Sequence, residues 1–252
     1  MKKLFTVLAV LLVATALFAA AGVTAKVGGT FAFANLNSAT DSNSEDFAES
    51  MNMKSNAFGF DVGAQYDIAD NLAVYADFVM VFPTDATMKD GGEEKKLSVA
   101  IKELEDGFKT IDEDASVSYK LNFFSVSAGV AYKLDFNAVK LAVGGGLTLN
   151  RATMTVNGSA EALDEVYSLS VKQTFTNIGL NALVDAKYMF NDNIGVGVAL
   201  NPQLGLYNIT KASMKMSEAL EAYFEDYFDD GSVNGFKVNF AMPITVGVSY
   251  TF

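Results

Sequence analysis

The sequence predicts an all-β fold, an eight-stranded antiparallel up-and-down transmembrane β-barrel. Half of the residues are hydrophobic, yet beyond the first 21 residues no stretch is long enough for a membrane-spanning helix. Apolar residues instead alternate with polar or small residues, which is the period of a β-strand with two different faces. In lipid such strands turn the apolar face outward, and the sheet must close because an open edge leaves backbone groups unpaired in hydrocarbon.

The first 21 residues have the pattern of a secretory signal peptide. Two lysines precede an apolar run over residues 4–18, and three alanines follow it. The run is short for a membrane helix, so we expect residues 1–21 to be cleaved and residues 22–252 to form the barrel. Cleavage after Ala21 or after Ala25 stays open. The chain has no Cys, so disulfides do not contribute to the fold.

The strand count comes from three hairpins that lie between two single strands. The hairpins cover residues 58–82, 126–149 and 178–206, each with a tight turn rich in Asp and Asn. Single strands are expected near residues 27–33 and 234–252. Eight strands let an up-and-down barrel close with both ends on one side. Ten strands remain an alternative if the long second loop forms a hairpin, and slips of the alternation at Phe123-Phe124 and near Asn177 leave β-bulges open.

A Tyr-x-apolar element ends every strand that runs toward the short turns. Tyr prefers a lipid–water boundary because its ring is apolar and its hydroxyl is polar. Short turns are periplasmic in barrels of this kind. The sequence therefore predicts a periplasmic aromatic girdle made of Tyr66, Tyr132, Tyr188 and Tyr250.

The last strand carries the most specific pattern, because Ile244, Val246, Val248, Tyr250 and Phe252 alternate up to the last residue. With this pattern the sequence resembles the small outer-membrane β-barrels of the OmpA/OmpX/OmpW-like group. The resemblance covers nearly the whole chain after the signal peptide. It implies a location in the cell outer membrane. It also implies that these five residues form the C-terminal signal recognised by the outer-membrane barrel assembly machinery.

The connections opposite the short turns are long, and in such barrels they are extracellular. They cover residues 37–54, 84–116, 157–172 and 209–233, and they hold most of the 30 Asp and Glu residues. We therefore expect the negative charge at the outer end. Amphipathic helices are predicted from Leu97 to Ile111 and from Met216 to Phe228. Their apolar faces either pack on each other as a cap or contact lipid or a partner.

Six charged residues at inward positions predict a polar network in the lumen. In a barrel as narrow as eight strands, these side chains should pair and plug the lumen, and a gated conduit is the alternative. The residues are Asp61, Asp77, Lys133, Lys140, Asp185 and Lys187.

The composition argues against an enzyme. With no His and no Cys, the Ser–His, His–Asp and Cys–His arrangements are excluded. We expect no catalytic residue, no cofactor and no metal site, since the acidic runs at residues 112–114 and 229–230 match solvated loop tips better than calcium loops. The net charge of −12 disfavours a nucleic-acid partner.

The expected function is a non-enzymatic outer-membrane barrel with a structural or surface-interaction role. Its expected partners are outer-membrane lipid, the assembly machinery during biogenesis, and an extracellular partner that contacts the acidic loops. The alternative is a narrow, porin-like channel for small hydrophobic or ionic solutes. Paired charges over the full height of the lumen would favour the first function. A continuous apolar tunnel that opens sideways near Pro202 or Pro243 would favour the second.

Overall fold

The computed structural model describes residues 22–37, 52–90, 93–110, 112–162, 165–217 and 231–252. The expected signal peptide, residues 1–21, lies outside them and stays a prediction. In chain order the described elements are β1 (Val23–Asn37), β2 (Asn52–Ala69), β3 (Leu72–Pro83), β4 (Thr87–Asp90), β5 (Glu93–Lys96), α2 (Leu97–Lys109), β6 (Ser116–Phe136), β7 (Val139–Ala162), β8 (Glu165–Met189), β9 (Ile194–Leu200), β10 (Gln203–Met216) and β11 (Gly231–Thr251).

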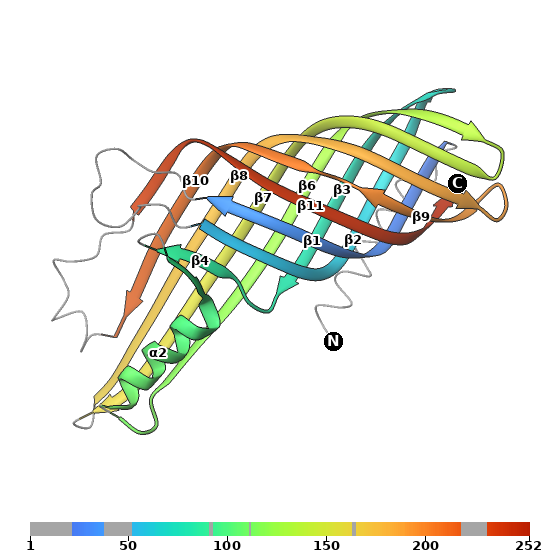
Figure 1. Cartoon of the computed structure of the whole chain (residues 1–252). Helices are drawn as coiled ribbons and strands as arrows, with labels where there is room; N and C mark the ends of the chain where they lie inside the picture. Colours follow the sequence, from blue (N-terminus) through green and yellow to red (C-terminus); the bar gives the residue numbers. More distant parts are fainter. Residues whose placement is uncertain (1–21, 38–51, 91–92, 111, 163–164, 218–230) are drawn as a thin grey trace.

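Antiparallel strands close into a ring in the order β1, β2, β3, β6, β7, β8, β9 with β10, and β11 (Figure 1). β9 and β10 act as one strand of the ring, interrupted at Asn201-Pro202. β9 pairs with β8 and β11 near the short turns, and β10 pairs with the same two strands farther out. The ring closes where β1 pairs with β11, from Thr24↔Thr251 to Asn35↔Phe240. The predicted eight-stranded antiparallel barrel is confirmed.

Tight turns join the strands at the end of the barrel where the chain terminates at Phe252. The β6–β7 turn places Asn137 at φ 61°, a left-handed conformation that Asn tolerates better than most residues. In the β8–β9 turn the side-chain oxygen of Asn191 accepts the N–H groups of Asn193, at 2.9 Å, and Ile194, at 2.8 Å. These local bonds explain why Asp and Asn residues mark the turns in the sequence.

The opposite end differs from the expected loops. β7 and β8 stay paired up to Ala162↔Glu165, so residues 157–172 form a long hairpin and not a loop. Strand β10 reaches Met216 and β11 begins at Gly231, which shortens the last connection as well. Of the helix expected from Met216 to Phe228, only Met216 and Ser217 are described, and Met216 belongs to β10. Residues 218–228 lie outside the described residues. Residues 84–116 do contain a hairpin, β4–β5, but β4 pairs with β2 outside the ring, so the barrel does not become ten-stranded.

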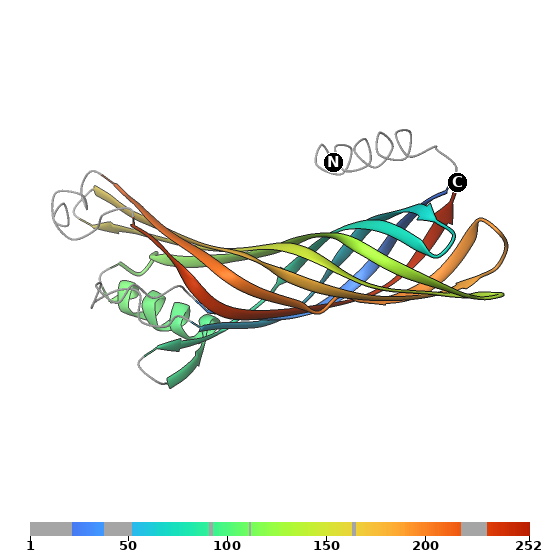
Figure 2. The same ribbon diagram turned by 90° about the horizontal axis from the view of Figure 1, so that it is seen from above.

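The outer wall of the barrel is uneven in height. A tilted membrane-spanning strand needs about 9–11 residues, whereas β7 has 24 residues and β8 has 25. β3 has only 12 residues. Above the end of β3 the wall is completed by the β4–β5 hairpin and by α2, which lies beside the outer half of the barrel (Figure 2). α2 is the first of the two helices expected from the sequence.

Side chains on the outward face of the inner half of the barrel are large, apolar and exposed. Phe58 is 74% exposed, Leu147 66%, Phe190 65% and Val246 58%. Such a continuous apolar surface suits contact with lipid hydrocarbon, as the alternation predicted. Among the described residues, no helix combines the length and hydropathy needed to cross a membrane.

The two faces exchange character in the outer half of β6, β7 and β8. There the inward residues are apolar, as with Phe123, Met154 and Phe175, while their neighbours in sequence on the outward face are mostly polar. This exchange explains the slip of the alternation at Phe123-Phe124. No bulge is needed at that point, because the pairing with β3 and β7 is continuous through both residues. The irregularity near Asn177 lies not on β8 itself but on its hydrogen-bonded neighbour β10, whose register shifts between Gly205 and Tyr207.

Glycines bring β6 and β7 close together in the inner half. A Cβ atom on Gly146 would lie 2.0 Å from the carbonyl oxygen of Ala128 and 2.5 Å from the Cα of Gly129. A Cβ atom on Gly129 would lie 2.2 Å from the carbonyl oxygen of Gly145. These positions therefore allow tight curling of the wall rather than leaving voids.

We expect Gly146→Ala to lower the free energy of unfolding by about 1–3 kcal/mol, because the added methyl group overpacks two backbones. Urea titration of the refolded chain, followed by the gel shift between folded and unfolded barrel, measures the change. The matched control is Gly29→Ala, where an added Cβ would meet no atom within 4 Å and the change should stay below about 0.5 kcal/mol. Equal effects of the two substitutions would contradict the close approach of β6 and β7.

Candidate functional site

The lumen is the first candidate site, and its described side chains form three layers along the barrel. Charged residues lie nearest the short turns, amide and hydroxyl residues lie in the middle, and apolar residues fill the outer half. Each layer is built from inward positions of several strands, so residues far apart in sequence meet. The chemistry that each layer can perform depends on how completely its groups are paired.

The charged layer is centred on Lys26 of β1. Its Nζ lies 2.8 Å from Oδ1 of Asp77 and 3.4 Å from Oδ2 of Asp61. Asp61 also accepts a hydrogen bond of 2.7 Å from the hydroxyl of Thr245. The side chains of Lys26, Asp61 and Asp77 are 11%, 4% and 5% exposed. One buried ammonium is therefore shared by two carboxylates from neighbouring strands.

Sequence reasoning named both carboxylates of this layer but missed Lys26. The signal was present, because Lys26 shares its parity with the inward Thr30 and is the only basic residue in β1. A single charge on the lumen side of an otherwise small-residue strand must find a partner inside.

The other four predicted lumen residues lie closer to the short turns. Lys187 contacts Asp185 at 3.3 Å, and Lys133 contacts Asp67, an inward carboxylate that is not among the six predicted residues, at 2.6 Å. Lys140 forms no ion pair with a described residue. With Lys133 and Lys187 it lines a hollow of about 110 Å³ that opens at the short-turn end. Five of the six predicted residues are thus divided among three ion-paired groups, and Lys140 belongs to none of them.

The middle layer consists of amides and hydroxyls, which sequence reasoning did not select. Gln203 is 1% exposed, and its amide bonds Ser125 at 3.1 Å and Ser127 at 3.3 Å. Asn181 is hydrogen-bonded to the hydroxyl of Tyr75 at 2.8 Å. A second group follows at the bulge of β10 and joins Asn177, Asn208 and Asn239. The recurrence of Asn at inward positions was the available signal.

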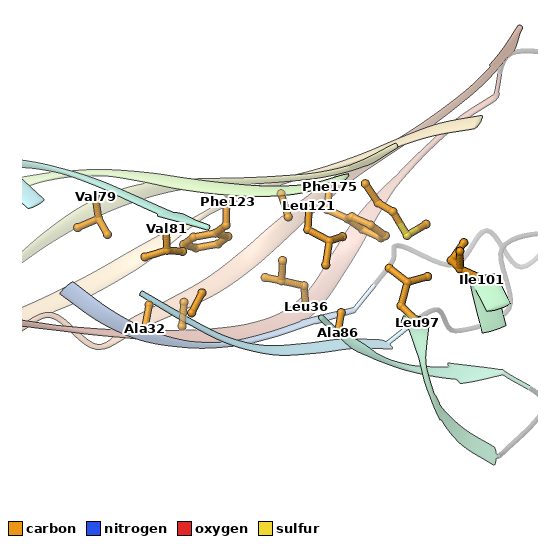
Figure 3. Close-up of a cluster of buried hydrophobic side chains, with 14 residues drawn as sticks. Ala32, Leu36, Val79, Val81, Ala86, Leu97, Ile101, Leu121, Phe123 and Phe175 are labelled. Atoms are coloured by element: carbon orange, nitrogen blue, oxygen red, sulfur yellow. The ribbon is translucent and has the colours of Figure 1, made fainter. Parts of the chain in front are cut away.

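The outer half of the lumen is filled by apolar side chains from seven strands and from α2 (Figure 3). Val81, Leu121 and Phe123 line the wall, and Leu97 and Ile101 of α2 lie at the outer end of the same cluster. This layer corrects the expectation of a polar inward face over the full height of the barrel. This layer covers only part of the apolar face of α2: Leu97 and Ile101 are buried in it, whereas Leu104 is 52% exposed.

Asp85 fixes the start of α2 from outside the helix. Its carboxylate accepts the N–H of Ser98 at 3.1 Å and the hydroxyl of Ser98 at 2.7 Å, so it does the work of an N-cap side chain. Partial burial raises the pKa of Asp85, but the hydrogen bonds from Ser98 and Ala86 and the charge of Lys96 outweigh burial and hold that pKa below its ordinary value.

The predicted girdle residues occupy equivalent places near the short turns. Tyr66, Tyr132, Tyr188 and Tyr250 point outward and are 45–51% exposed. Tyr188 and Tyr250 each make an edge contact with the aromatic ring two residues later. The residues expected to form the C-terminal signal also face outward on β11, and the N–H of Phe252 bonds the carbonyl of Val23 at 2.9 Å.

The acidic run at residues 112–114 is held by backbone contacts. Asp112 accepts the N–H of Glu161 at 2.6 Å and of Asp114 at 3.0 Å, which ties the segment after α2 to β7. Within the part of the chain that the structure describes, no group of three or more acidic side chains is arranged to hold a metal ion. Residues 229–230 lie outside the described part.

The comparisons with known proteins agree with this architecture. The family model described as outer membrane protein beta-barrel domain matches residues 5–252. The chain belongs to this family. As a member of it, the protein is located in the outer membrane, with its apolar outer face in the lipid bilayer. No curated protein matches the sequence.

Solved outer-membrane barrels resemble the chain at low sequence identity. The outer membrane protein OprG from Pseudomonas aeruginosa matches with a TM-score of 0.52 at 12% identity, covering 92% of this chain and 96% of its own. Neisserial surface protein A matches with a TM-score of 0.45 at 17% identity, covering 92% and 98%. The outer membrane protease OmpT from Escherichia coli matches with a TM-score of 0.42 at 10% identity, covering 91% and 96%. At 12% identity, the likeness to OprG concerns the fold alone.

We expect Lys26→Met to lower the free energy of unfolding by about 3–5 kcal/mol, because it leaves two buried carboxylates without their cation. The control is Lys133→Met. The side chains of the Lys133–Asp67 ion pair are 23% and 34% exposed, so this substitution should lower the free energy of unfolding by about 1 kcal/mol or less. Both variants can be measured by urea unfolding in the same detergent. Restored stability in Lys26→Met/Asp61→Asn/Asp77→Asn would show that the unpaired charges cause the loss, whereas similar losses in the two single variants would argue against it.

The cap of α2 should depend on pH. Because the folded pKa of Asp85 lies below its ordinary value of 3.8, the ionised form stabilises the helix above that pH. The stabilisation should disappear as pH falls below about 4 through the folded pKa. At pH 7, Asp85→Ala should lower the free energy of opening of α2 by about 1 kcal/mol. Hydrogen exchange of the α2 amides measures this change. Asp106→Ala, on the exposed face of α2, serves as control, and equal exchange in the two variants would contradict the capping role.

Proposed function

We propose that this protein is a closed, non-enzymatic outer-membrane barrel that acts through its extracellular projections and not through its lumen. The observation that carries the proposal is the succession of three side-chain layers inside the ring. In the charged layer Lys26 is shared by two carboxylates, in the middle layer Gln203 is 1% exposed, and in the outer layer α2 closes the apolar cluster. An eight-stranded barrel is just wide enough for its own side chains to fill it.

The chemistry inside the lumen supports a structural role for the charged groups. Each carboxylate of the inner layer faces a cation or a hydroxyl, which is the arrangement expected of a salt-bridged filling. The sequence contains no His or Cys to serve as a base or nucleophile. We therefore infer that Asp61, Asp77 and Asp185 hold strands together and perform no acid–base catalysis.

The projections beyond the membrane offer the surface for contact with other molecules. α2 and the β4–β5 hairpin carry ion pairs at their surface, joining Lys54 to Glu94, Lys95 to Glu103 and Lys109 to Glu105. Because these pairs are solvent-exposed, they can be exchanged for pairs with a partner at little cost. An extracellular partner of the acidic segments remains part of the proposal.

Two features belong to insertion rather than to surface function. The ring of Tyr66, Tyr132, Tyr188 and Tyr250 would fix the barrel at the periplasmic boundary of the lipid. The outward residues Ile244, Val246, Val248, Tyr250 and Phe252 would be recognised by the assembly machinery before β11 pairs with β1. Both roles rest on the position of these residues on strands near the short turns.

One observation favours the alternative, transport of small apolar solutes. The inner wall of the outer half is apolar, and in the amide layer beside it the strand is irregular at Asn201-Pro202, where the N–H of Asn201 still donates to the carbonyl of Pro243 at 3.1 Å. Pro243, on the neighbouring strand β11, has no N–H to donate there. A solute leaving the apolar layer sideways would pass at this point. Faster entry of an apolar dye into liposomes that contain the barrel than into empty liposomes would favour this function.

Planar bilayers test whether the lumen is closed. We expect no steady single-channel conductance from the refolded wild type or from Asp185→Ala, because the middle and outer layers still fill the lumen after the inner one is weakened. An open porin inserted in the same membrane is the positive control. Steady conductance that changes with Asp185→Ala would overturn the closed barrel and make transport of ions the leading function.

A further inference from the structure

The outward face of the tall wall carries a group of basic residues that has no role in the proposed function. Its five cations are Lys120 on β6, Arg151 on β7, Lys172 on β8, and Lys211 and Lys215 on β10. All five are exposed. This set, here called the basic face, lies within a protein whose formal net charge is −12, so its concentration on one wall is not expected from composition.

The strand register places these residues in adjoining rows. Lys120 pairs with Thr155, Thr155 pairs with Lys172, and Lys172 pairs with Ser213. The rows on either side hold Lys211 beside Thr174 and Lys215 beside Ser170. Rows on one face of a strand are about 7 Å apart. The cations are therefore separated by hydroxyl groups that can also donate hydrogen bonds.

No acidic side chain interrupts the basic face. The described outward positions between the row of Arg151 and the row of Ser159 hold hydroxyl, amide, apolar and basic residues, but no Asp or Glu. None of the five cations makes an ion pair with a described residue, whereas Lys26 and Lys187 in the lumen, Lys95 in β5 and Lys109 in α2 do. The basic face is thus available to an external anion.

The position of the basic face relative to the lipid indicates which kind of anion it would bind. Immediately below Arg151, on the side of the short turns, the same four strands present Val126, Leu149, Ile178 and Tyr207 in one row. Val126, Leu149 and Ile178 are 38–46% exposed and belong to the lipid-facing surface. The basic face therefore begins where the hydrocarbon ends, on the extracellular side.

A hollow completes the surface at its upper end. It measures about 310 Å³ and is lined by Ser116, Ser118, Asn157, Ser159, Ser170 and Lys215, among others. Hydroxyl and amide groups beside an ammonium suit a phosphate ester or a sugar hydroxyl. A headgroup larger than a bare phosphate would have room there.

We propose that the basic face binds the phosphate groups of anionic lipids in the outer leaflet. Arg151 would engage the phosphate nearest the hydrocarbon, where its planar fork can bind two oxygens. Lys120, Lys172 and Lys211 would neutralise the charge above it. The serine-lined hollow would hold the rest of the headgroup. This inference does not depend on whether the lumen conducts.

Native mass spectrometry of the folded full chain in zwitterionic detergent tests the proposal. Short-chain phosphatidic acid is the probe, and phosphatidylcholine of the same chain length is the reference lipid. We expect tighter binding of phosphatidic acid by the wild type. Each basic side chain near an anionic lipid is worth about a fivefold change in affinity, so Lys120→Gln/Lys172→Gln/Lys211→Gln should weaken binding by at least about tenfold. Arg151→Gln alone should weaken it about fivefold.

The matched control removes the same charge from another exposed surface. Lys95→Gln/Lys102→Gln/Lys109→Gln changes three lysines before and within α2 and should alter the affinity for phosphatidic acid less than about twofold. All variants are first checked for the gel shift of the folded barrel. Equal losses in the two triple variants, or no loss in either, would overturn the proposal. Binding of inositol hexakisphosphate as tight as that of phosphatidic acid would also overturn it, in favour of a soluble polyanion.

Discussion

Backbone hydrogen bonding in hydrocarbon is the constraint on which this structure depends. A strand in lipid has no water to satisfy its N–H and C=O groups, so the sheet must close on itself, and here it closes by pairing β1 with β11. Closure with eight strands makes the lumen narrow. A narrow lumen has to be filled by side chains, and the outward positions are then free to meet lipid. The interior pairing of Lys26 with two carboxylates and the exposed Phe58 both follow from this one requirement.

The filling of the lumen changes because the surroundings of the barrel change along its axis. Near the short turns the outside is hydrocarbon, and the polar residues of each strand lie inside, where they must find partners. In the outer half the outside is headgroup and water, so polar residues such as Lys172 can point outward. Their neighbours in sequence, such as Phe175, then point inward and form an apolar core with α2. The barrel is thus a membrane protein in one half and resembles a soluble β-protein in the other.

This exchange of faces also explains what could be predicted from the sequence. Alternation against lipid is a strong signal, and it located the ring strands, the tight turns and the inward Asp61, Asp77 and Asp185. The same alternation continues through residues 157–172, but Ser and Asn beside Gly and Ala give little contrast, so the sequence predicts a loop where the structure has a hairpin. Lys26 lies just before the strand expected near residues 27–33, whereas β1 already begins at Val23, so its inward parity is visible only once the strand is extended. The pairing of Lys133 with Asp67 depends on side-chain reach, which spacing along the chain does not encode.

The uneven wall gives the outer half its separate surfaces. β3 ends at Pro83, whereas β7 and β8 continue to residues 162 and 165, so one side of the barrel needs α2 and the β4–β5 hairpin to cover its apolar interior. The tall side needs no cover, because its inner face packs on the opposite elements and its outer face is polar. The ion-paired residues of the short side and the five cations of the tall side, which pair with no described carboxylate, therefore lie on different walls. From the net charge alone, this end of the molecule would be called acidic. The strand register shows instead that a basic surface lies beside the lipid, apart from the acidic residues that face water.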